Sequence, residues 1–451
     1  MKKYRLIFAT FLIGIAFTSC EDELNIEPAQ EISTEVALSS GENVENILIG
    51  AYEEAGQADS YGGDIQMLSD LYGFTNEATW RGTFTQPRDV FRKNIFVDNS
   101  YVRDIWLNGY EVINQANLVV DNIELVDEEE QDNIAGQAMF LRALTYFDLV
   151  RLYGAPYEAG QENSQPGVPL SLEGVIDYSG NLEIPRNSVE EVYNQILEDL
   201  NNAFEMLPAS NSFFADKYAA KALLARVYLQ QGNYTGARDA ANDVIENSDH
   251  SLTDTYEEAF NNEVDSDEYI FAFQVTTQGG GNDLVLHYAQ EDLGGRGGDI
   301  TVNPEFIEMF DSETDDRSSF FYESDDNGET LTSKYTNQFA NIPVIRLAEM
   351  YLIRAEANFR LGTSIGNTPT EDINVIRERA NANLLDNVGL DEILKERELE
   401  LAFEGFLIQD LQRTMRPVGD LEYDDERLTF PIPQREMDVN SLLEQNPGYG
   451  Q

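Results

Sequence analysis

The sequence has one cysteine, Cys20, and only two histidines among its 451 residues. A lone cysteine cannot form a disulfide within the chain, and this set is too small for a structural zinc site. The glycine-rich run at 294–298 lacks the preceding strand, the spacing and the lysine of a phosphate-binding loop. We therefore predict no metal site, no cofactor and no disulfide framework.

One acidic stretch imitates the start of a calcium-binding loop. Glu323, Asp325 and Asn327 have the alternate spacing of the first ligands, and Gly328 follows them. Lys334, however, occupies the position at which such a loop needs a bidentate glutamate. The stretch is predicted to be a hairpin turn.

Basic residues are scarce: the chain has 29 Lys+Arg against 83 Asp+Glu, a formal net charge of −54. Three of the basic residues lie among the first 19 residues, so the remainder has 26 basic and 83 acidic residues and a charge of −57. Such a field repels nucleic acid and anionic lipid surfaces, and we predict no nucleic-acid partner. It would also repel strongly anionic polysaccharides unless cations bridged them, although a charge summed over the surface does not describe one site.

Long hydrophobic runs are absent except near the start, where Leu6–Phe17 follows Lys2, Lys3 and Arg5. This run is too short to span a bilayer, which requires about 20 apolar residues. A basic start, an apolar centre and small residues before a cut are typical of a secretory signal peptide. We predict that residues 1–19 are removed.

Cys20 stands where a lipoprotein signal peptidase leaves the new N-terminus, and a lone thiol in an exported protein requires an explanation. Its position and uniqueness predict lipidation, although Phe17 replaces the more usual leucine of the motif. The alternative is an ordinary signal peptide cut near a chance cysteine. Residues 20–33 are polar and are predicted to be a tether, so that the lipid is the only membrane contact.

Apolar residues recur at helical spacing through most of the remaining chain. Ser188 and Glu191 predict a capping box at the start of one helix. Residues 57–100 are rich in glycine, aspartate, threonine and aromatics and are predicted to be a long loop or a loop-and-turn insertion, a kind of segment that is usually functional or disordered. Residues 248–341 are predicted to be irregular, with a strand at 269–275. Predicted helices cover about 34–55, 100–124, 128–153, 188–207, 216–231, 233–246, 344–361 and 370–380.

Two helical pairs look like repeats of one another. Ala225, Leu229 and Gly232 have the same spacing as a small residue, a bulky residue and a glycine at 355, 359 and 362. The unit has about the size of a tetratricopeptide repeat, roughly 34 residues. We predict an all-α fold: a tetratricopeptide-like helical-repeat scaffold with an irregular, loop-rich ligand platform and a few short strands. We divide it at 34–215 and 216–451 and expect one compact unit.

Several short stretches follow one another in a characteristic order. They are Leu48–Tyr52, Trp106–Asn117, Arg142–Pro156, Ala222–Tyr234, Ile345–Ala357, Glu396–Arg413 and Pro431–Tyr449. Together they resemble the SusD/RagB-like family of outer-membrane nutrient-uptake lipoproteins over nearly the whole chain after the signal peptide. The resemblance implies a four-unit tetratricopeptide-like scaffold, a loop-built ligand platform and a location at the cell surface. It also implies a SusC-like, TonB-dependent outer-membrane channel as partner, and an oligosaccharide or, in some members, a peptide as cargo.

A sugar ring binds by lying against an aromatic face while amide, carboxylate and guanidinium groups bond its hydroxyls. Trp80 is the strongest candidate, because it lies outside any helical pattern beside Arg81 and near Asn76. The alternative is a tryptophan that fixes the loop to the scaffold. Trp106 has helical spacing and is predicted to be core. The remaining ligand-binding candidates are Tyr61, predicted to be exposed beside two glycines, Tyr72, which could instead pack, and His287 with Tyr288.

The charged block at 396–413 suggests a catalytic acid and base. Alternating charges at helical spacing more often form surface ion pairs or hold two helices in register. With 83 carboxylates, almost any two can be paired on paper. We therefore predict no catalytic residues and a binding protein. The alternatives are a helical-repeat assembly scaffold that binds no nutrient and, less favoured, a glycoside hydrolase.

Overall fold

The computed structural model describes residues 38–177, 179–276, 281–311 and 314–450. The predicted signal peptide, Cys20 and the tether at 20–33 lie outside this part of the chain. Among the described residues, no helix combines the length and the apolar character needed to cross a membrane.

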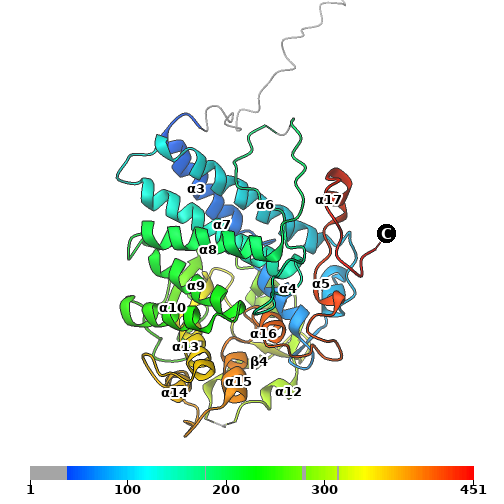
Figure 1. Cartoon of the computed structure of the whole chain (residues 1–451). Coiled ribbons are helices and arrows are strands. Elements are labelled where there is room, and N and C mark those ends of the chain that lie inside the picture. The colour runs from blue at the N-terminus through cyan, green and yellow to red at the C-terminus, as the bar shows by residue number, and fades with distance from the viewer. Residues whose placement is uncertain (1–37, 178, 277–280, 312–313, 451) are drawn as a thin grey trace, which may run out of the picture.

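Eight helices form one column in which each helix packs against the next along the chain. Figure 1 shows the column from α3 at the top to α14 at the bottom. Its helices pair as α3 with α6, α7 with α8, α9 with α10 and α13 with α14. This arrangement confirms the predicted all-α, tetratricopeptide-like scaffold. The helices are α3 (Gly41–Ala55), α6 (Ser100–Asp121), α7 (Gln131–Tyr153), α8 (Val189–Met206), α9 (Lys217–Gln230), α10 (Tyr234–Asn247), α13 (Leu347–Leu361) and α14 (Pro369–Arg379).

Local signals fix where the repeat helices begin and end. Ser188 and Glu191 form the predicted capping box of α8, which satisfies two backbone N–H groups. The two repeated turn glycines both have left-handed backbones, with φ of 69° at Gly232 and 64° at Gly362. Only glycine adopts this region without a steric cost, and the predicted repeat of helix, glycine and reversal is confirmed.

Three boundaries differ from the predictions. Helix α3 begins at Gly41, not near residue 34, because Ser40 caps it by accepting from the Asn43 N–H. Residues 342–346 form a strand before α13. The predicted loop at 57–100 contains α4 (Asp64–Gly73), β1 (Ala78–Trp80) and α5 (Thr85–Phe91). Helix α4 is buried on all sides from Ile65 onward, so it has no polar face to produce a helical pattern in the sequence.

The strands form three two-stranded antiparallel sheets. They are β1 with β3 (Ile300–Val302), β2 (Tyr269–Phe273) with β6 (Ile342–Arg346), and β4 (Phe321–Glu323) with β5 (Thr330–Thr332). The predictions of a strand near 269–275 and of a hairpin turn at 323–328 are confirmed. The remaining short elements are η2 (Ile123–Leu125), η3 (Glu257–Ala259), α11 (Leu284–Tyr288), η4 (Glu291–Leu293), α12 (Pro304–Ile307), η5 (Asp316–Ser319), α15 (Leu390–Glu400), α16 (Leu407–Arg413), η6 (Glu426–Leu428) and α17 (Gln434–Val439).

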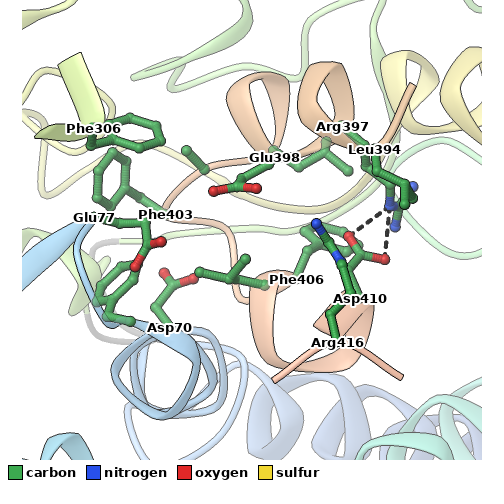
Figure 2. Close-up of a pocket in the computed structure, with 14 residues that line it drawn as sticks. Asp70, Glu77, Phe306, Leu394, Arg397, Glu398, Phe403, Phe406, Asp410 and Arg416 are labelled. Carbon is green, nitrogen blue, oxygen red and sulfur yellow. Dashed lines mark hydrogen bonds and ion pairs between the residues drawn. The ribbon is translucent and has the colours of Figure 1, made fainter. Parts of the chain in front are cut away.

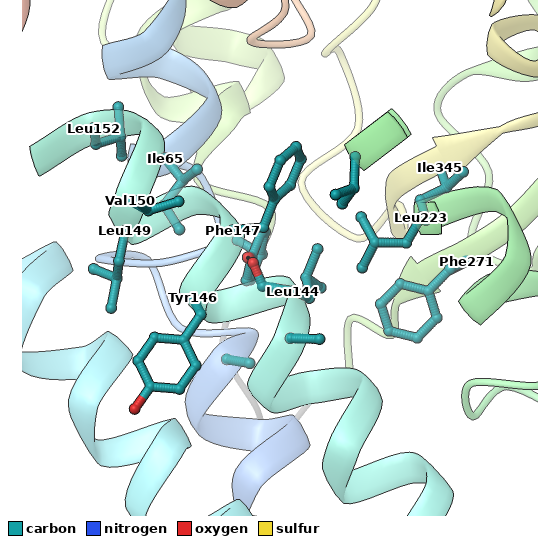
Figure 3. Close-up of a cluster of buried hydrophobic side chains, with 14 of the residues drawn as sticks. Ile65, Leu144, Tyr146, Phe147, Leu149, Val150, Leu152, Leu223, Phe271 and Ile345 are labelled. Atoms are coloured by element: carbon teal, nitrogen blue, oxygen red, sulfur yellow. Dashed lines mark hydrogen bonds between the residues drawn. The ribbon is translucent and has the colours of Figure 1, made fainter. Parts of the chain in front are cut away.

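The largest apolar core runs from Val44 to Leu443, and α7 lies at its centre. Figure 3 shows Leu144 and Phe147 of α7 on the side of the helix that faces Phe271 of β2. Tyr146 points the other way and is also fully buried. The core thus joins the helical column to β2 and β6, while the division at residue 215 stays a prediction.

The charged block near the C-terminus lies inside the protein. Arg413 bonds Glu356 of α13 at 2.7 Å and Asp410 of α16 at 2.7 Å, and Arg397 of α15 bonds Asp410 at 2.8 Å. All four side chains are less than 10% exposed. Of the two predicted roles, holding helices in register fits these contacts, and surface ion pairing does not. Buried carboxylates need such partners because an isolated buried charge is strongly destabilising.

Candidate ligand site

A pair of short strands brings together two loops that are distant in the sequence. Strand β1 pairs with β3 so that Trp80 lies opposite Ile300. Beyond the pair, the backbone N–H of Arg81 donates to the carbonyl of Asp299 at 2.6 Å. The turn after β1 is therefore fixed beside the glycine-rich loop at 294–298.

Four rings cluster at this junction, and we call them the aromatic platform: Trp80, Phe84, Tyr101 and His287. The imidazole of His287, on α11, is central, since its ring centroid lies 5.6 Å from Trp80, 6.1 Å from Phe84 and 6.5 Å from Tyr101. Trp80 and His287 are buried, at 6% and 2% exposure. Phe84 and Tyr101 are partly exposed, so they are the rings available to a ligand in solution.

Charged groups surround the platform. His287 Nδ1 lies 2.8 Å from Asp299 Oδ2, and Arg296 Nε lies 3.2 Å from the same oxygen. The guanidinium of Arg296 also covers the Phe84 ring at 3.8 Å from its centroid, a cation–π contact. Arg81 is 55% exposed, and its only ion pair among the described residues is a 3.8 Å contact with Glu329. Such an exposed pair contributes little, so Arg81 is available to a ligand.

Two features of the junction between the turn after β1 and the glycine-rich loop favour binding of a polar ligand. The indole N–H of Trp80 is buried and has no hydrogen-bond partner among the described residues, which is a costly arrangement unless water or a ligand hydroxyl accepts from it. A Cβ at Gly82 would lie 2.5 Å from the Trp80 ring and 2.6 Å from Asp299. Glycine at this position therefore lets the backbone pass directly against the platform.

Burial raises the pKa of Tyr101 to about 12, and Asp64 contributes by repulsion. The phenol of Tyr101 is consequently protonated at neutral pH and can donate a hydrogen bond to an oxygen of a ligand.

The predicted site residues separate into two groups. Trp80 and His287 meet at the platform, with His287 as its buried centre, and Arg81 follows Trp80 in the turn after β1, with its guanidinium 3.8 Å from Glu329. Asn76 is exposed at the opposite end of β1, where its carbonyl accepts from Asn303. Whether any of them touches a ligand stays a prediction.

Three predicted tyrosines lie in the core. Tyr61 is 2% exposed, stacks on Phe273 at 5.1 Å and donates to Asp148. Its predicted exposure was wrong, because these long-range partners cannot be read from the neighbouring glycines. Tyr72 donates to the carbonyl of Arg427 and Tyr288 donates to Asp70. These buried rings present no face to a sugar in this conformation, so a ligand role for them stays an unsupported prediction.

Sequence reasoning missed Tyr101, Arg296 and Asp299 as site residues and did not count Phe84 among them. Tyr101 occupies the first turn of α6, where it resembles any partly buried helical residue. The glycines around Arg296 were a signal of a special loop. They did not reveal the pairing of β1 with β3 that brings this loop to Trp80.

A small cavity elsewhere in the protein gathers three carboxylates. Figure 2 shows Asp70, Glu77 and Glu398 directed toward one another across it. Burial raises the pKa of Asp70 to about 7, and burial with the charge of Glu77 raises that of Glu398 to about 7. The cavity measures about 20 Å³, which is room for about one water molecule. A sugar ring does not fit, so this cluster does not form a glycosidase site in this conformation.

A groove of about 630 Å³ lies between the 155–165 segment and the chain near 424–447. Its lining includes Glu158, Glu162, Asp424 and Glu426 but no aromatic ring. It therefore lacks the stacking face that the platform offers. Within the described ranges, no three His, Cys, Asp or Glu side chains are grouped so as to hold a metal ion.

The paired helices, with an aromatic and arginine-bearing platform at one side, define a helical-repeat protein with a loop-borne candidate site. A family model described as the SusD family matches residues 199–428, just over half of the chain. A second model, described as starch-binding and associating with the outer membrane, matches residues 24–229. The chain therefore belongs to the SusD family, as its sequence motifs predicted.

Individual relatives agree with this assignment. The chain is 26% identical to the SusD-like protein P38 of Formosa agariphila, over the full length of both. It is also 26% identical to the starch-binding protein SusD of Bacteroides thetaiotaomicron, over 76% of this chain and 77% of that protein. A crystal structure of a SusD superfamily protein from Bacteroides thetaiotaomicron superposes with a TM-score of 0.82 at 26% identity, covering 90% of this chain and all of the other. A putative sugar binding protein from Bacteroides vulgatus gives 0.81 at 27% identity, over 93% of this chain and all of the other.

Proposed function

We propose that this protein captures oligosaccharides at the outer surface of the outer membrane and delivers them to a SusC-like, TonB-dependent channel. The observation that carries the proposal is the aromatic platform. It gathers two partly exposed rings, Phe84 and Tyr101, with the guanidinium of Arg296 over Phe84, and the exposed side chain of Arg81 follows Trp80 in the same turn. Rings that stack on C–H faces and donors that bond hydroxyls are the two requirements of sugar binding.

The relatives support this ligand class. Two of them are described as starch-binding and as a putative sugar binding protein. In the proposed function the platform binds its ligand and catalyses no reaction. The alternative cargo is a peptide, because aromatic and arginine side chains can also bind a peptide. A helical-repeat scaffold without a ligand is less favoured, because assembly alone does not require rings and arginines gathered at one junction.

The attachment to the membrane is proposed to be the lipid on Cys20. Between Cys20 and the first described residue, Leu38, lie the tether and a further short stretch. At about 3.5 Å per residue, 18 residues reach at most about 60 Å. The chain enters the fold at α3, at one end of the helical column in Figure 1. A tether of this length lets the folded part dock on a channel while the lipid stays in the outer leaflet.

Removal of one exposed ring tests the proposal. We expect Phe84→Ala to weaken binding of a glycan ligand at least tenfold, since stacking surface is lost while the buried Trp80 and His287 stay in place. Phe213→Ala is the matched control, because Phe213 is 50% exposed and lies on the connection before α9. Isothermal titration with a glycan panel measures both variants, and equal affinity of Phe84→Ala and wild type would reject the platform as the site.

A further inference from the structure

About a third of the cationic side chains of this acidic chain are buried. Nine Lys and Arg side chains of the described residues are buried, and each of these nine bonds a carboxylate. Because they are paired and away from solvent, they offer nothing to a ligand. Any positive charge on the surface therefore comes from the remainder.

The segment that follows β1 is an exception to the acidic composition. Between residues 81 and 93 it has four basic residues and the single acid Asp89. Lys93 is engaged, since its ammonium donates to three backbone carbonyls. Arg88 and Arg92 form no ion pair with any described residue, and the Nε of Arg88 is buried without a hydrogen-bond partner. Arg81 has only its long contact with Glu329.

A fifth cation reaches the same junction from the other loop. Arg296 donates from Nη2 to the hydroxyl of Thr83 at 3.1 Å and lies over Phe84. Its side chain is 32% exposed, whereas its partner Asp299 is 7% exposed. The accessible charge at this point is thus the guanidinium and not the carboxylate.

The acidic side chains near these cations either form ion pairs or have raised pKa values. Asp299 is shared between His287 and Arg296. Burial raises the pKa of Asp64 well above its ordinary range and also raises that of Asp283, which favours their neutral forms. Glu329, at 42% exposure, is the remaining accessible acid in contact with this group.

We propose that the platform selects glycans that carry an anionic group, a carboxylate or a sulfate ester, and that Arg81 and Arg296 hold this group while a sugar ring lies on Phe84 or Tyr101. Guanidinium groups bind such oxyanions through two parallel hydrogen bonds. Arg88 on the adjacent helix α5 and Arg92 directly after it add positive charge. The inference rests on the proposed capture function and specifies its ligand class.

The whole chain has a negative net charge, which by itself would repel an anionic glycan. At physiological ionic strength the screening length is about 8 Å, so the distant carboxylates repel an arriving polyanion weakly. Contacts at hydrogen-bond distance are screened much less. The local cations then decide which ligand is preferred once it touches the platform.

Two matched pairs of polymers test the inference on the mature chain. Polygalacturonate is compared with its methyl ester, and dextran sulfate with dextran, by affinity electrophoresis in about 0.15 M salt. We expect one anionic polymer to bind at least tenfold more tightly than its neutral counterpart. The first pair reports a carboxylate and the second a sulfate ester.

Variants identify the residues responsible. We expect Arg81→Gln, and the double variant that also carries Arg296→Gln, to lose the preference for the anionic polymer. The melting temperature and the helical circular dichroism of Arg81→Gln are expected to stay at wild-type values. Arg427→Gln is the control, because Arg427 is 58% exposed on η6 and pairs only with Asp425 among the described residues.

Tighter binding of the neutral polymer of each pair would overturn the anionic preference and leave glycan capture standing. An equal loss of binding in Arg427→Gln would show diffuse electrostatic attraction and would also overturn it. Failure of wild type to bind any of the four polymers, or any member of a wider glycan array, would reject both the preference and the proposed function.

Discussion

Arginine has opposite surroundings in the helical scaffold and at the platform. In the scaffold, Arg346 is 1% exposed and contacts Glu268, Glu400 and Glu404. At the platform, Arg81 is 55% exposed and has one loose partner. The scaffold uses guanidinium groups to neutralise buried carboxylates, while the platform leaves them facing solvent. In a chain with nearly three times as many acids as bases, this exposed arginine stands out, and we propose that it belongs to the ligand site.

The buried carboxylates and arginines of the protein stabilise one another in their charged forms. Although burial alone would raise it, the pKa of Glu400 is lowered to about 2 by Arg379, Arg346 and Arg317. This carboxylate is therefore ionised at neutral pH. Removal of a cation from such a group leaves a buried charge without compensation.

The largest effect is expected for Arg346→Met. We expect it to lower the free energy of unfolding by about 3–5 kcal/mol, because Glu268 and Glu404 lose a buried partner. Urea denaturation followed by circular dichroism measures it. A loss below about 1 kcal/mol would contradict the description of these arginines as structural.

Within the platform, the buried and the exposed rings should behave differently. Trp80→Ala is expected to cost about 3 kcal/mol, since it empties a buried site, and its effect on binding would be mixed with unfolding. Phe84→Ala should cost about 1 kcal/mol, because part of its surface is already in water. Thermal melting of both variants measures the difference in stability. An equal loss of stability would contradict the distinction between a buried, structural Trp80 and an exposed Phe84.

The two repeat-turn glycines offer a graded comparison inside the scaffold. Gly362→Ala is expected to cost about 1 kcal/mol, because the backbone is left-handed while the space around the new Cβ is empty. Gly232→Ala should cost more, since its Cβ would lie 2.8 Å from that of Ala159. Chemical denaturation that ranks the two variants in the reverse order would contradict this.

Glu398 links stability to pH. Its folded pKa of about 7 lies above that of the unfolded chain, so its contribution is present in full below about pH 4.3 and is lost as the pH rises through 7. We expect Glu398→Gln to be about 1 kcal/mol more stable than wild type at pH 8, after allowance for solvent screening, with no gain at pH 4. Urea denaturation at several pH values measures this, and a gain that is independent of pH would exclude titration of Glu398 as its cause.

The smallest effect on stability is expected for Arg81→Gln, within about 0.5 kcal/mol of wild type. An exposed arginine with a 3.8 Å partner makes little contribution to folding. A melting temperature lowered as much as that of Arg346→Met would place Arg81 among the structural arginines and remove the contrast.

Much of the scaffold could be predicted because its signals are local. The capping box of Ser188 and Glu191 and the turn glycines at 232 and 362 each act within one helical turn. Helix α4 escaped prediction because it is buried on all sides and so has no alternating face.

The site was only partly predictable because it is assembled over long distances. Trp80 and Arg81 stand out locally, but the pairing of β1 with β3 joins residues more than 200 positions apart. The interior position of Tyr61 depends on Asp148 and Phe273, which its own neighbours in the sequence do not reveal.

The central claim is that the exposed rings of the platform bind a glycan. The most direct measurement is the affinity of the mature wild-type chain, Phe84→Ala and Phe213→Ala for whichever polymer the glycan array identifies. We expect at least a tenfold loss for Phe84→Ala and none for Phe213→Ala, with both variants folded. Unchanged binding by a folded Phe84→Ala variant would contradict it and would place the ligand elsewhere on the protein.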